Sequence, residues 1–264
     1  MEAEHIARIK EKINSSSIED EFHCLRSICL SITDYCNLSC SYCPHATFFK
    51  NRKIFMKDIV VEELSKQLLK YNFDGMISIS GMGEPTLHPN LIEIVKALSM
   101  FSIQVISNGL NPIDYKELTK YAELIISLHR KEDLHLIQKN LGTTQYILRN
   151  HDISDQNSSF TPCNRYEVNS VANLHHICHY PFYKTTIDYD GSYLLCQEDW
   201  KRYSKKHTIF DIDIYKYFTE YLHNMKMNMY LYSRNILPCS CCNVDGRLIG
   251  EEYVEYFKQK YIER

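Results

Sequence analysis

Three cysteines that lie close together in the sequence offer the most specific chemistry in the chain. Cys36, Cys40 and Cys43 form a C-x3-C-x2-C pattern, with Tyr42 directly before the third cysteine. Thiolates at this spacing in a tight loop can face one point, as the ligands of an iron–sulfur cluster do. A cubane 4Fe–4S cluster has four irons, so three ligands leave one iron open to another molecule. Zinc is the alternative; it needs a fourth ligand, for which His45 is available.

The segment before the cysteines indicates where they lie in the fold. Residues 28–33 are apolar and strand-like, and Asp34 ends the run. The cysteine loop would follow a first strand, where α/β barrels place their chemistry. This arrangement resembles the radical S-adenosylmethionine (SAM) superfamily, whose signature is C-x3-C-x-aromatic-C after the first barrel strand. The resemblance implies that the three cysteines hold a 4Fe–4S cluster, that SAM binds its open iron beside Tyr42, and that reductive cleavage of SAM gives a 5′-deoxyadenosyl radical.

Strand and helix patterns alternate through the first 150 residues. Strands are predicted at residues 28–33, 76–80, 103–107, 124–128 and 145–148. Helices are predicted at residues 6–13, 59–71, 91–100, 113–121 and 131–141. Such alternation produces parallel strands joined by crossover helices. Five strands cannot close an eight-stranded barrel, so we expect an α/β fold, a partial (β/α) TIM-like barrel of about five to six strands.

The turn after the second predicted strand reads Gly81-Met82-Gly83-Glu84-Pro85. Glycines let a backbone approach a ligand closely, and the Glu84 carboxylate can accept hydrogen bonds from an ammonium group. The turn resembles the G-G-E-P motif of the same superfamily, in a G-x-G-E-P form. The resemblance implies that Gly81, Met82, Gly83 and Glu84 bind SAM. An ordinary turn between strand and helix is the alternative.

Two further turns follow the third and fourth predicted strands. Ser107-Asn108-Gly109 resembles the superfamily's S/T-N-G turn near SAM, and Ser127 stands where a serine of relatives often reaches SAM. His129 follows, at a position where relatives often carry Asp. Hydroxyl and amide groups at the carboxyl ends of strands can bind polar ligands, but many such residues only cap helices.

Four cysteines form a second constellation in the C-terminal half. Cys178 and Cys196 flank a predicted hairpin that turns at Asp190-Gly191, and Cys239 and Cys242 form a C-x2-C pair. The pattern resembles the SPASM/twitch extension of radical SAM enzymes in its short form, which implies one auxiliary 4Fe–4S cluster. A structural zinc on the same four cysteines is the alternative. Cys241 competes with its neighbours as a ligand.

The change of pattern near Asn150 suggests the domain organisation. We expect an N-terminal helix and linker (1–25), a radical SAM core (26–150) and a twitch domain (151–264). The last part would contain the hairpin, a helix over residues 213–231 and a C-terminal helix.

Composition excludes several classes of protein. The 264 residues carry a net charge of −3, which does not indicate the basic surface typical of nucleic-acid-binding proteins. No apolar run is long enough to cross a membrane, and no signal segment is present at the N-terminus, so we expect a cytoplasmic protein. Eleven cysteines in a reducing compartment indicate metal ligands more than disulfides.

The overall layout resembles radical SAM dehydrogenases of the 2-deoxy-scyllo-inosamine type. It implies oxidation of a small polar substrate, with electrons reaching the first cluster from a flavodoxin or ferredoxin-type reductant. Arg165 lies where relatives carry an N-R-x-G element and could bind the substrate; a surface salt bridge is its alternative. A peptide maturase that forms thioether or carbon–carbon links, and a non-enzymatic metal-binding module, are the other hypotheses.

Overall fold

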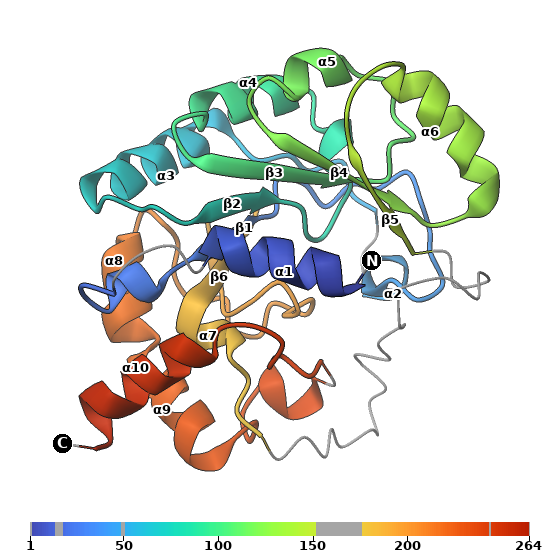
Figure 1. The fold of residues 1–264 in the computed structure, drawn as a ribbon. Helices are drawn as coiled ribbons and strands as arrows, with labels where there is room; N and C mark the ends of the chain where they lie inside the picture. The colour runs from blue at the N-terminus through green and yellow to red at the C-terminus, as the bar shows by residue number, and fades with distance from the viewer. Residues whose placement is uncertain (1, 14–17, 49–50, 152–175, 243, 264) are drawn as a thin grey trace.

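The computed structural model describes residues 2–13, 18–48, 51–151, 176–242 and 244–263. They form one sheet of seven strands in the order β5-β4-β3-β2-β1-β6-β7 (Figure 1). The strands are β1 (Ser27–Leu30), β2 (Met76–Ile79), β3 (Ser102–Ser107), β4 (Glu123–Leu128), β5 (Ile147–Asn150), β6 (Lys184–Ile187) and β7 (Tyr193–Leu194). The first six run parallel, and β7 is antiparallel to β6.

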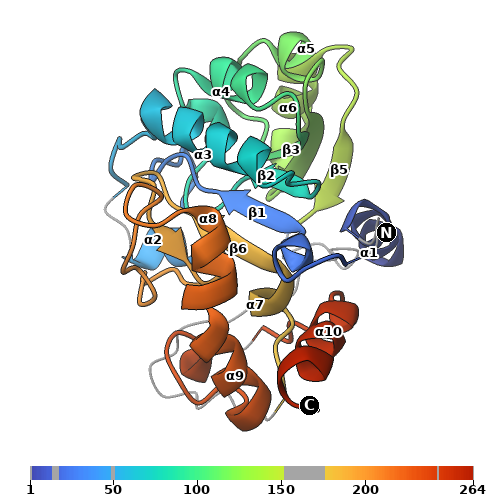
Figure 2. The same cartoon turned by 90° about the vertical axis from the view of Figure 1, so that its left-hand side faces the viewer.

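Helices join the parallel strands and extend the chain beyond them. The helices that precede residue 151 are α1 (Glu2–Ile13), α2 (Pro44–Phe48), α3 (Asp58–Lys70), α4 (Leu91–Ala97), α5 (Tyr115–Leu118) and α6 (Leu134–Leu141). Those after it are α7 (Tyr180–Tyr183), α8 (Ile214–Lys216), α9 (His223–Tyr232) and α10 (Glu251–Tyr261). Helices α3 to α6 line the outer face of the sheet, while α9 and α10 gather beyond β6 (Figure 2). No described helix is both long and apolar enough to span a bilayer.

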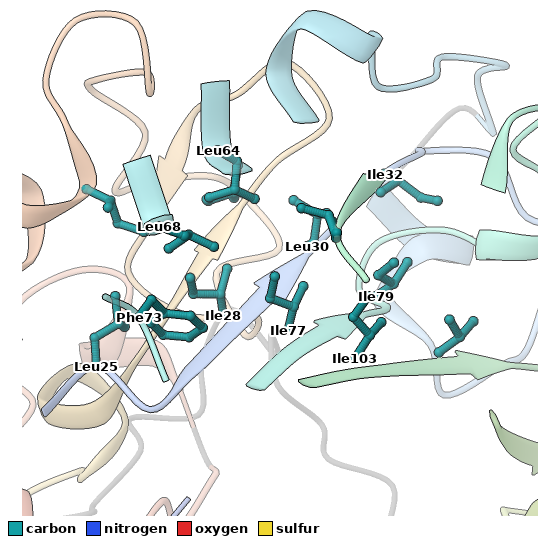
Figure 3. Close-up of a cluster of buried hydrophobic side chains, with 14 of the residues drawn as sticks. Leu25, Ile28, Leu30, Ile32, Leu64, Leu68, Phe73, Ile77, Ile79 and Ile103 are labelled. Carbon is teal, nitrogen blue, oxygen red and sulfur yellow. The ribbon is translucent and has the colours of Figure 1, made fainter. Parts of the chain in front are cut away.

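The outer face of the sheet is apolar. Branched side chains of β1, β2 and β3 point toward two leucines of α3 (Figure 3). The residues are Ile28, Leu30, Ile77, Ile79 and Ile103 from the strands and Leu64 and Leu68 from the helix, all buried. Their alternation along each strand follows from the two-residue period of a β-strand. Burying each such side chain stabilises the fold by about 1.5–3 kcal/mol relative to leaving it exposed.

The inner face of the same strands carries small polar side chains. One row of side chains crosses four neighbouring strands, because each residue is paired in register with the next. In the order β3, β2, β1 and β6, the residues are Gln104, Ser78, Cys29 and Thr186. All four are buried, and Gln104 Nε2 donates to Ser78 Oγ at 3.0 Å. Closed TIM barrels fill this interior with bulky branched residues. The row therefore makes the interior of this partial barrel polar.

The expected α/β fold with a partial parallel barrel is confirmed, and the differences are local. The fifth strand lies at Ile147–Asn150, two residues later than predicted. The predicted hairpin is present, with Gly191 at a φ of 82°, and its first strand, β6, pairs with β1 as a sixth parallel strand. The helix predicted over 213–231 is interrupted, because a π-helical turn at Tyr217–Tyr221 separates α8 from α9. The division of the chain into domains at residue 150 stays a prediction.

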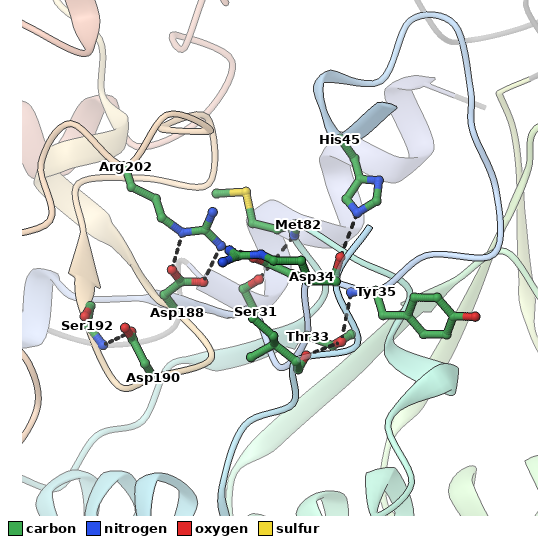
Figure 4. A network of polar contacts seen from close by, with 12 residues as sticks. Ser31, Thr33, Asp34, Tyr35, His45, Met82, Asp188, Asp190, Ser192 and Arg202 are labelled. Atoms are coloured by element: carbon green, nitrogen blue, oxygen red, sulfur yellow. Dashed lines mark hydrogen bonds and ion pairs between the residues drawn. The ribbon is translucent and has the colours of Figure 1, made fainter. Parts of the chain in front are cut away.

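A buried group of ion pairs joins the C-terminal segment to the start of the cysteine loop (Figure 4). Arg202 donates through Nη2 to Asp34 Oδ1 at 2.5 Å, and its guanidinium also binds both carboxylate oxygens of Asp188. The side chains of Asp34 and Asp188 are fully buried. Arg52 adds a bond of 3.0 Å to Asp34 Oδ2. We call Arg202, Asp34 and Asp188 the Arg202 clamp.

Asp188 depends on the clamp more than Asp34 does. Burial raises the pKa of the Asp188 carboxyl, and the hydrogen bonds and charge of Arg202 act against that shift. Asp34 retains Arg52 as a second cation, whereas the only ion pair of Asp188 among the described residues is with Arg202. Removing Arg202 would leave the Asp188 carboxylate buried without a counter-charge.

We expect Arg202→Met to lower the free energy of unfolding by about 3–5 kcal/mol at neutral pH, because it leaves a buried carboxylate unpaired. The deficit should shrink as the pH falls, since the already raised pKa of Asp188 rises further and the folded state then binds the proton more tightly than the unfolded state. Urea denaturation at several pH values measures it. Arg247→Met, which removes an exposed arginine paired with Asp245, is the control and should leave the midpoint nearly unchanged. An Arg202→Met protein as stable as wild type would contradict the clamp.

Candidate functional site

A cavity of about 250 Å³ opens at the carboxyl ends of the parallel strands. Its walls contain all three cysteines of the first pattern and every residue that the sequence predicts to contact SAM. These lining residues are Cys36, Cys40, Cys43, Tyr42, Gly81, Met82, Gly83, Glu84, Ser107, Asn108 and Ser127. The fold therefore brings together four segments that are far apart in the sequence.

The cysteine loop is a compact turn that ends in α2. The Leu38 N–H group donates to Cys36 Sγ at 3.4 Å, and the Cys43 N–H group donates to the Cys40 carbonyl at 3.0 Å. Burial raises the pKa of the Cys36 thiol to about 12. The thiolate form at this position therefore needs a compensating positive charge, which a metal centre supplies.

His45, the alternative zinc ligand, has another role in the structure. Its side chain is buried, and its Nε2 atom lies 2.8 Å from the carbonyl oxygen of Asp34. A ring nitrogen that faces a carbonyl oxygen must carry the proton and donate it. His45 therefore fastens α2 to the start of the cysteine loop.

The Gly81–Glu84 turn packs directly against the backbone of the cysteine loop. A Cβ atom on Gly83 would lie 2.5 Å from the Thr33 carbonyl oxygen and 2.6 Å from that of Tyr35, so no larger residue fits. The Glu84 N–H group donates to the Tyr35 carbonyl at 2.8 Å. Gly81 has a φ of 112°, a backbone conformation that residues with a Cβ atom rarely adopt. The glycines of this turn thus fix its distance from the cysteines.

The Glu84 carboxylate connects the turns that follow β2 and β3. Its Oε1 atom accepts from Thr86 N (3.0 Å), Thr86 Oγ1 (2.7 Å) and Ser107 Oγ (2.7 Å), and its Oε2 atom accepts from Asn108 N (2.8 Å). Burial raises the pKa of Glu84, while these donors act in the opposite direction. Oε1 thus accepts three hydrogen bonds and Oε2 one, so a further donor would bind at Oε2. The structural role of Glu84 was not part of the sequence prediction.

Asn108 joins the third turn to the cysteine loop. Its Nδ2 group donates to Asn37 Oδ1 at 2.7 Å, and its Oδ1 atom accepts from the Leu110 N–H group at 2.9 Å. Asn37 lies between the first two cysteines of the loop. The turns after β2 and β3 therefore both hold the loop that carries the thiols.

One wall of the cavity carries two histidines next to Tyr42. The Tyr42 hydroxyl is hydrogen-bonded to His129 Nδ1, and the His129 and His151 rings meet edge to face with centroids 5.7 Å apart. Burial lowers the pKa of His129 to about 4, so its ring is neutral at pH 7. The sequence prediction did not include His151, although its place just after a strand end was a usable signal.

The second set of cysteines lines another, smaller cavity. Cys178, Cys196, Cys239 and Cys242 all face a space of about 20 Å³. Cys241 does not line this space, and its Sγ atom donates to the Pro238 carbonyl at 3.2 Å. This placement favours the C-x2-C pair over Cys241.

Gly246 is required beside this second set of cysteines. A Cβ atom there would lie 2.4 Å from Cys178 Sγ, and the residue has a φ of 75°. Burial raises the pKa of the Cys178, Cys196 and Cys239 thiols. Like the first set, these thiols suit a metal centre whose charge would stabilise the thiolates.

The spacing of the thiols bears on the choice between zinc and a cluster. A single zinc ion needs all its sulfur ligands about 2.3 Å from one point. Within the described ranges, no three Cys, His, Asp or Glu side chains converge in that way. A cubane binds each cysteine through a different iron, so its ligands surround a larger object.

Arg165, the predicted substrate contact, lies outside the residues that the structure describes, as does its neighbour Cys163. Trp200, by contrast, lines the first cavity and was not predicted. It is the single tryptophan of the chain and follows Cys196 by four residues, which could have drawn attention to it.

Comparison with known proteins agrees with this geometry. Residues 30–147 match the model of the radical SAM superfamily. The crystal structure of BtrN in complex with AdoMet and 2-DOIA is similar with a TM-score of 0.68 and 20% identity, covering 85% of this chain and 98% of BtrN. The crystal structure of BtrN in an open conformation is similar with a TM-score of 0.63 and 20% identity, covering 83% of this chain and 92% of that chain.

More distant is SuiB of Streptococcus suis bound to S-adenosylmethionine, with a TM-score of 0.44 and 15% identity over 82% of this chain and 69% of SuiB. No curated protein sequence matches the chain significantly. Residues 30–147 therefore match a superfamily whose cofactors are a 4Fe–4S cluster and SAM, and the chain has a fold like that of BtrN.

Proposed function

We propose that the protein is a radical SAM oxidoreductase that oxidises a secondary alcohol of a small, sugar-like or aminocyclitol-like substrate. The observation that carries the proposal is the pairing of two cysteine-lined cavities. The segment from Cys196 to Trp200 contributes to the walls of both. The similarity in fold to BtrN, a 2-deoxy-scyllo-inosamine dehydrogenase whose complex contains 2-DOIA, supports this reaction class.

The cofactor-binding roles follow from the first cavity. Cys36, Cys40 and Cys43 would hold the first cluster, and Glu84 Oε2 would accept a hydrogen bond from the amino group of SAM. The lining residues Tyr42, Gly81, Met82, Gly83, Ser107, Asn108 and Ser127 would form the rest of the SAM site. When bound, these cofactors would supply a 5′-deoxyadenosyl radical that takes the carbinol hydrogen atom from the substrate. A base would take the hydroxyl proton, and an auxiliary cluster would accept the second electron.

The second cavity suits an auxiliary 4Fe–4S cluster. Four thiols, from Cys178, Cys196, Cys239 and Cys242, would saturate its irons, which favours electron transfer over binding of the substrate. Arg165 as a contact to a polar substrate group, a flavodoxin or ferredoxin-type reductant, and a cytoplasmic location remain predictions from the sequence.

Replacing Cys36, Cys40 and Cys43 together by Ala should leave about half of the iron and abolish SAM cleavage, because only the first cluster is lost. Iron and sulfide counts after anaerobic reconstitution, with a 5′-deoxyadenosine assay, measure both effects. Cys241→Ala is the matched control and should keep all the iron, since its thiol does not line either cavity. Full iron in the triple variant, or stoichiometric zinc in wild type, would refute two clusters.

Glu84→Gln should weaken SAM binding by about 1.5–3 kcal/mol, which is about 10- to 150-fold, because a charge-assisted contact is lost. Thr86→Val serves as the comparison. It removes one internal donor to Glu84, so it should reduce thermal stability and leave SAM affinity unchanged. Equilibrium binding of SAM measures both variants. Unchanged SAM affinity in Glu84→Gln would take Glu84 out of the binding site.

Cys178→Ser and Cys196→Ser should stop product formation while 5′-deoxyadenosine still forms. The reason is that the first cavity stays intact when only the second loses a ligand. With polyols or aminocyclitols, the wild-type enzyme should form a product that mass spectrometry shows to be two hydrogens lighter than its substrate. One product molecule should form for each SAM molecule consumed. A cross-linked peptide would instead indicate a maturase, and a product isomeric with its substrate would indicate a mutase.

A further inference from the structure

We infer that Trp200 forms the substrate-contacting wall of the SAM cavity and selects substrates with an apolar ring face; this inference rests on the proposed function. Among the described residues that line the cavity, Trp200 alone comes from the chain after residue 151. All the others belong to the cysteine loop and α2, the turns after β2 and β3, and the ends of β3, β4 and β5. Trp200 is thus the contribution of the C-terminal segment to the site.

The indole is packed against the machinery of the first cavity. Trp200 is 8% exposed and forms a small apolar cluster with Met82 and Leu194, against which Cys43 packs. Met82 belongs to the turn after β2, and Leu194 belongs to β7. The tryptophan therefore bridges the hairpin of the C-terminal segment and the edge of the cysteine loop.

The loop that carries Trp200 is tightly constrained. The buried carboxylate of Asp199 accepts from Tyr203 N (2.9 Å), Ser204 N (2.8 Å) and Ser204 Oγ (2.5 Å), and Ser204 Oγ in turn accepts from Leu195 N (2.8 Å). Two residues after Trp200, the Arg202 clamp attaches the same loop to Asp34. Bonds on both sides of the tryptophan therefore hold the backbone of this loop in place.

The same loop connects Trp200 with the second cavity. Cys196 and Glu198 line that cavity, whereas Trp200 lines the first. Four residues of extended chain span at most about 14 Å, which limits the separation of the Cys196 and Trp200 backbones. A substrate that rests on the indole therefore lies near both cysteine sets, as an oxidation that uses both requires.

The two sides of the cavity differ in chemistry, which indicates the class of substrate. Trp200 and Met82 offer an apolar surface, while Glu84, Asn108 and Ser127 offer oxygen and nitrogen atoms. A cyclitol or aminocyclitol presents C–H groups on the face of its ring and hydroxyl or amino groups around its edge. Its face can pack on the indole, which buries a large area in a fixed orientation, while its edge meets the polar wall.

The single tryptophan makes the inference directly measurable. We expect 2-deoxy-scyllo-inosamine to change the fluorescence of Trp200 saturably when it is added to the reconstituted full chain with SAM. Trp200→Ala should raise KM for this probe by about tenfold or more, and Trp200→Phe by less, because the aromatic surface is lost or reduced. SAM affinity and the spectrum of the first cluster should not change in Trp200→Phe, which keeps an aromatic ring against Met82 and Cys43. Tyr203→Ala, an exposed aromatic on the same loop, should leave KM unchanged.

The outcomes separate this inference from the proposed function. If wild type oxidises the probe and Trp200→Ala has the same KM, the wall assignment is wrong and the alcohol oxidation stands. If the probe changes Trp200 fluorescence but no product two hydrogens lighter appears, the oxidation fails and the wall assignment stands. Loss of SAM affinity in Trp200→Phe, or a wild-type fluorescence that responds to SAM but not to the probe, would overturn the inference.

Discussion

Two carboxylates buried at different places in the chain need one cation, and the arrangement of the site depends on that need. Asp34 precedes the cysteine loop, Asp188 follows β6, and Arg202 follows the wall residue Trp200. A planar guanidinium can satisfy two carboxylates at once, which a lysine ammonium does less well. The Arg202 clamp thus fixes the cysteine loop, the sixth parallel strand and the C-terminal segment relative to one another. Such buried pairs contribute specificity of position more than net stability.

A second set of bonds positions the SAM cavity from the opposite side. Glu84 joins the turns after β2 and β3, and Asn108 ties the later turn to Asn37 in the cysteine loop. Irregular turns therefore hold one another through side chains, while the sheet below supplies only their spacing. The apolar outer face packs on α3, and the polar row on the inner face leaves the barrel interior suited to polar molecules. Glu84, which the sequence predicts to bind SAM, therefore also holds the turns after β2 and β3 together.

Local patterns in the sequence predicted much of this and missed what depends on distant contacts. Alternating strand and helix periodicity located β1 to β4 closely, and the turns at their ends identified residues that now share one cavity. The place of β6 beside β1 could not be predicted, because pairing between segments more than 150 residues apart leaves no local signal. The same holds for Arg202 and Trp200, whose roles arise only when the C-terminal segment packs on the cysteine loop. The interrupted helix at Tyr217–Tyr221 shows that apolar spacing predicts a helix without revealing its hydrogen-bond pattern.

Two clusters with different tasks are expected to serve the SAM cavity. The most direct measurement is electron paramagnetic resonance of the reduced, reconstituted full chain with and without SAM, together with its iron content. We expect about eight irons per chain and two cubane signals, of which SAM changes only the one that depends on Cys36, Cys40 and Cys43. About four irons with a single signal, or two signals that both respond to SAM, would contradict it.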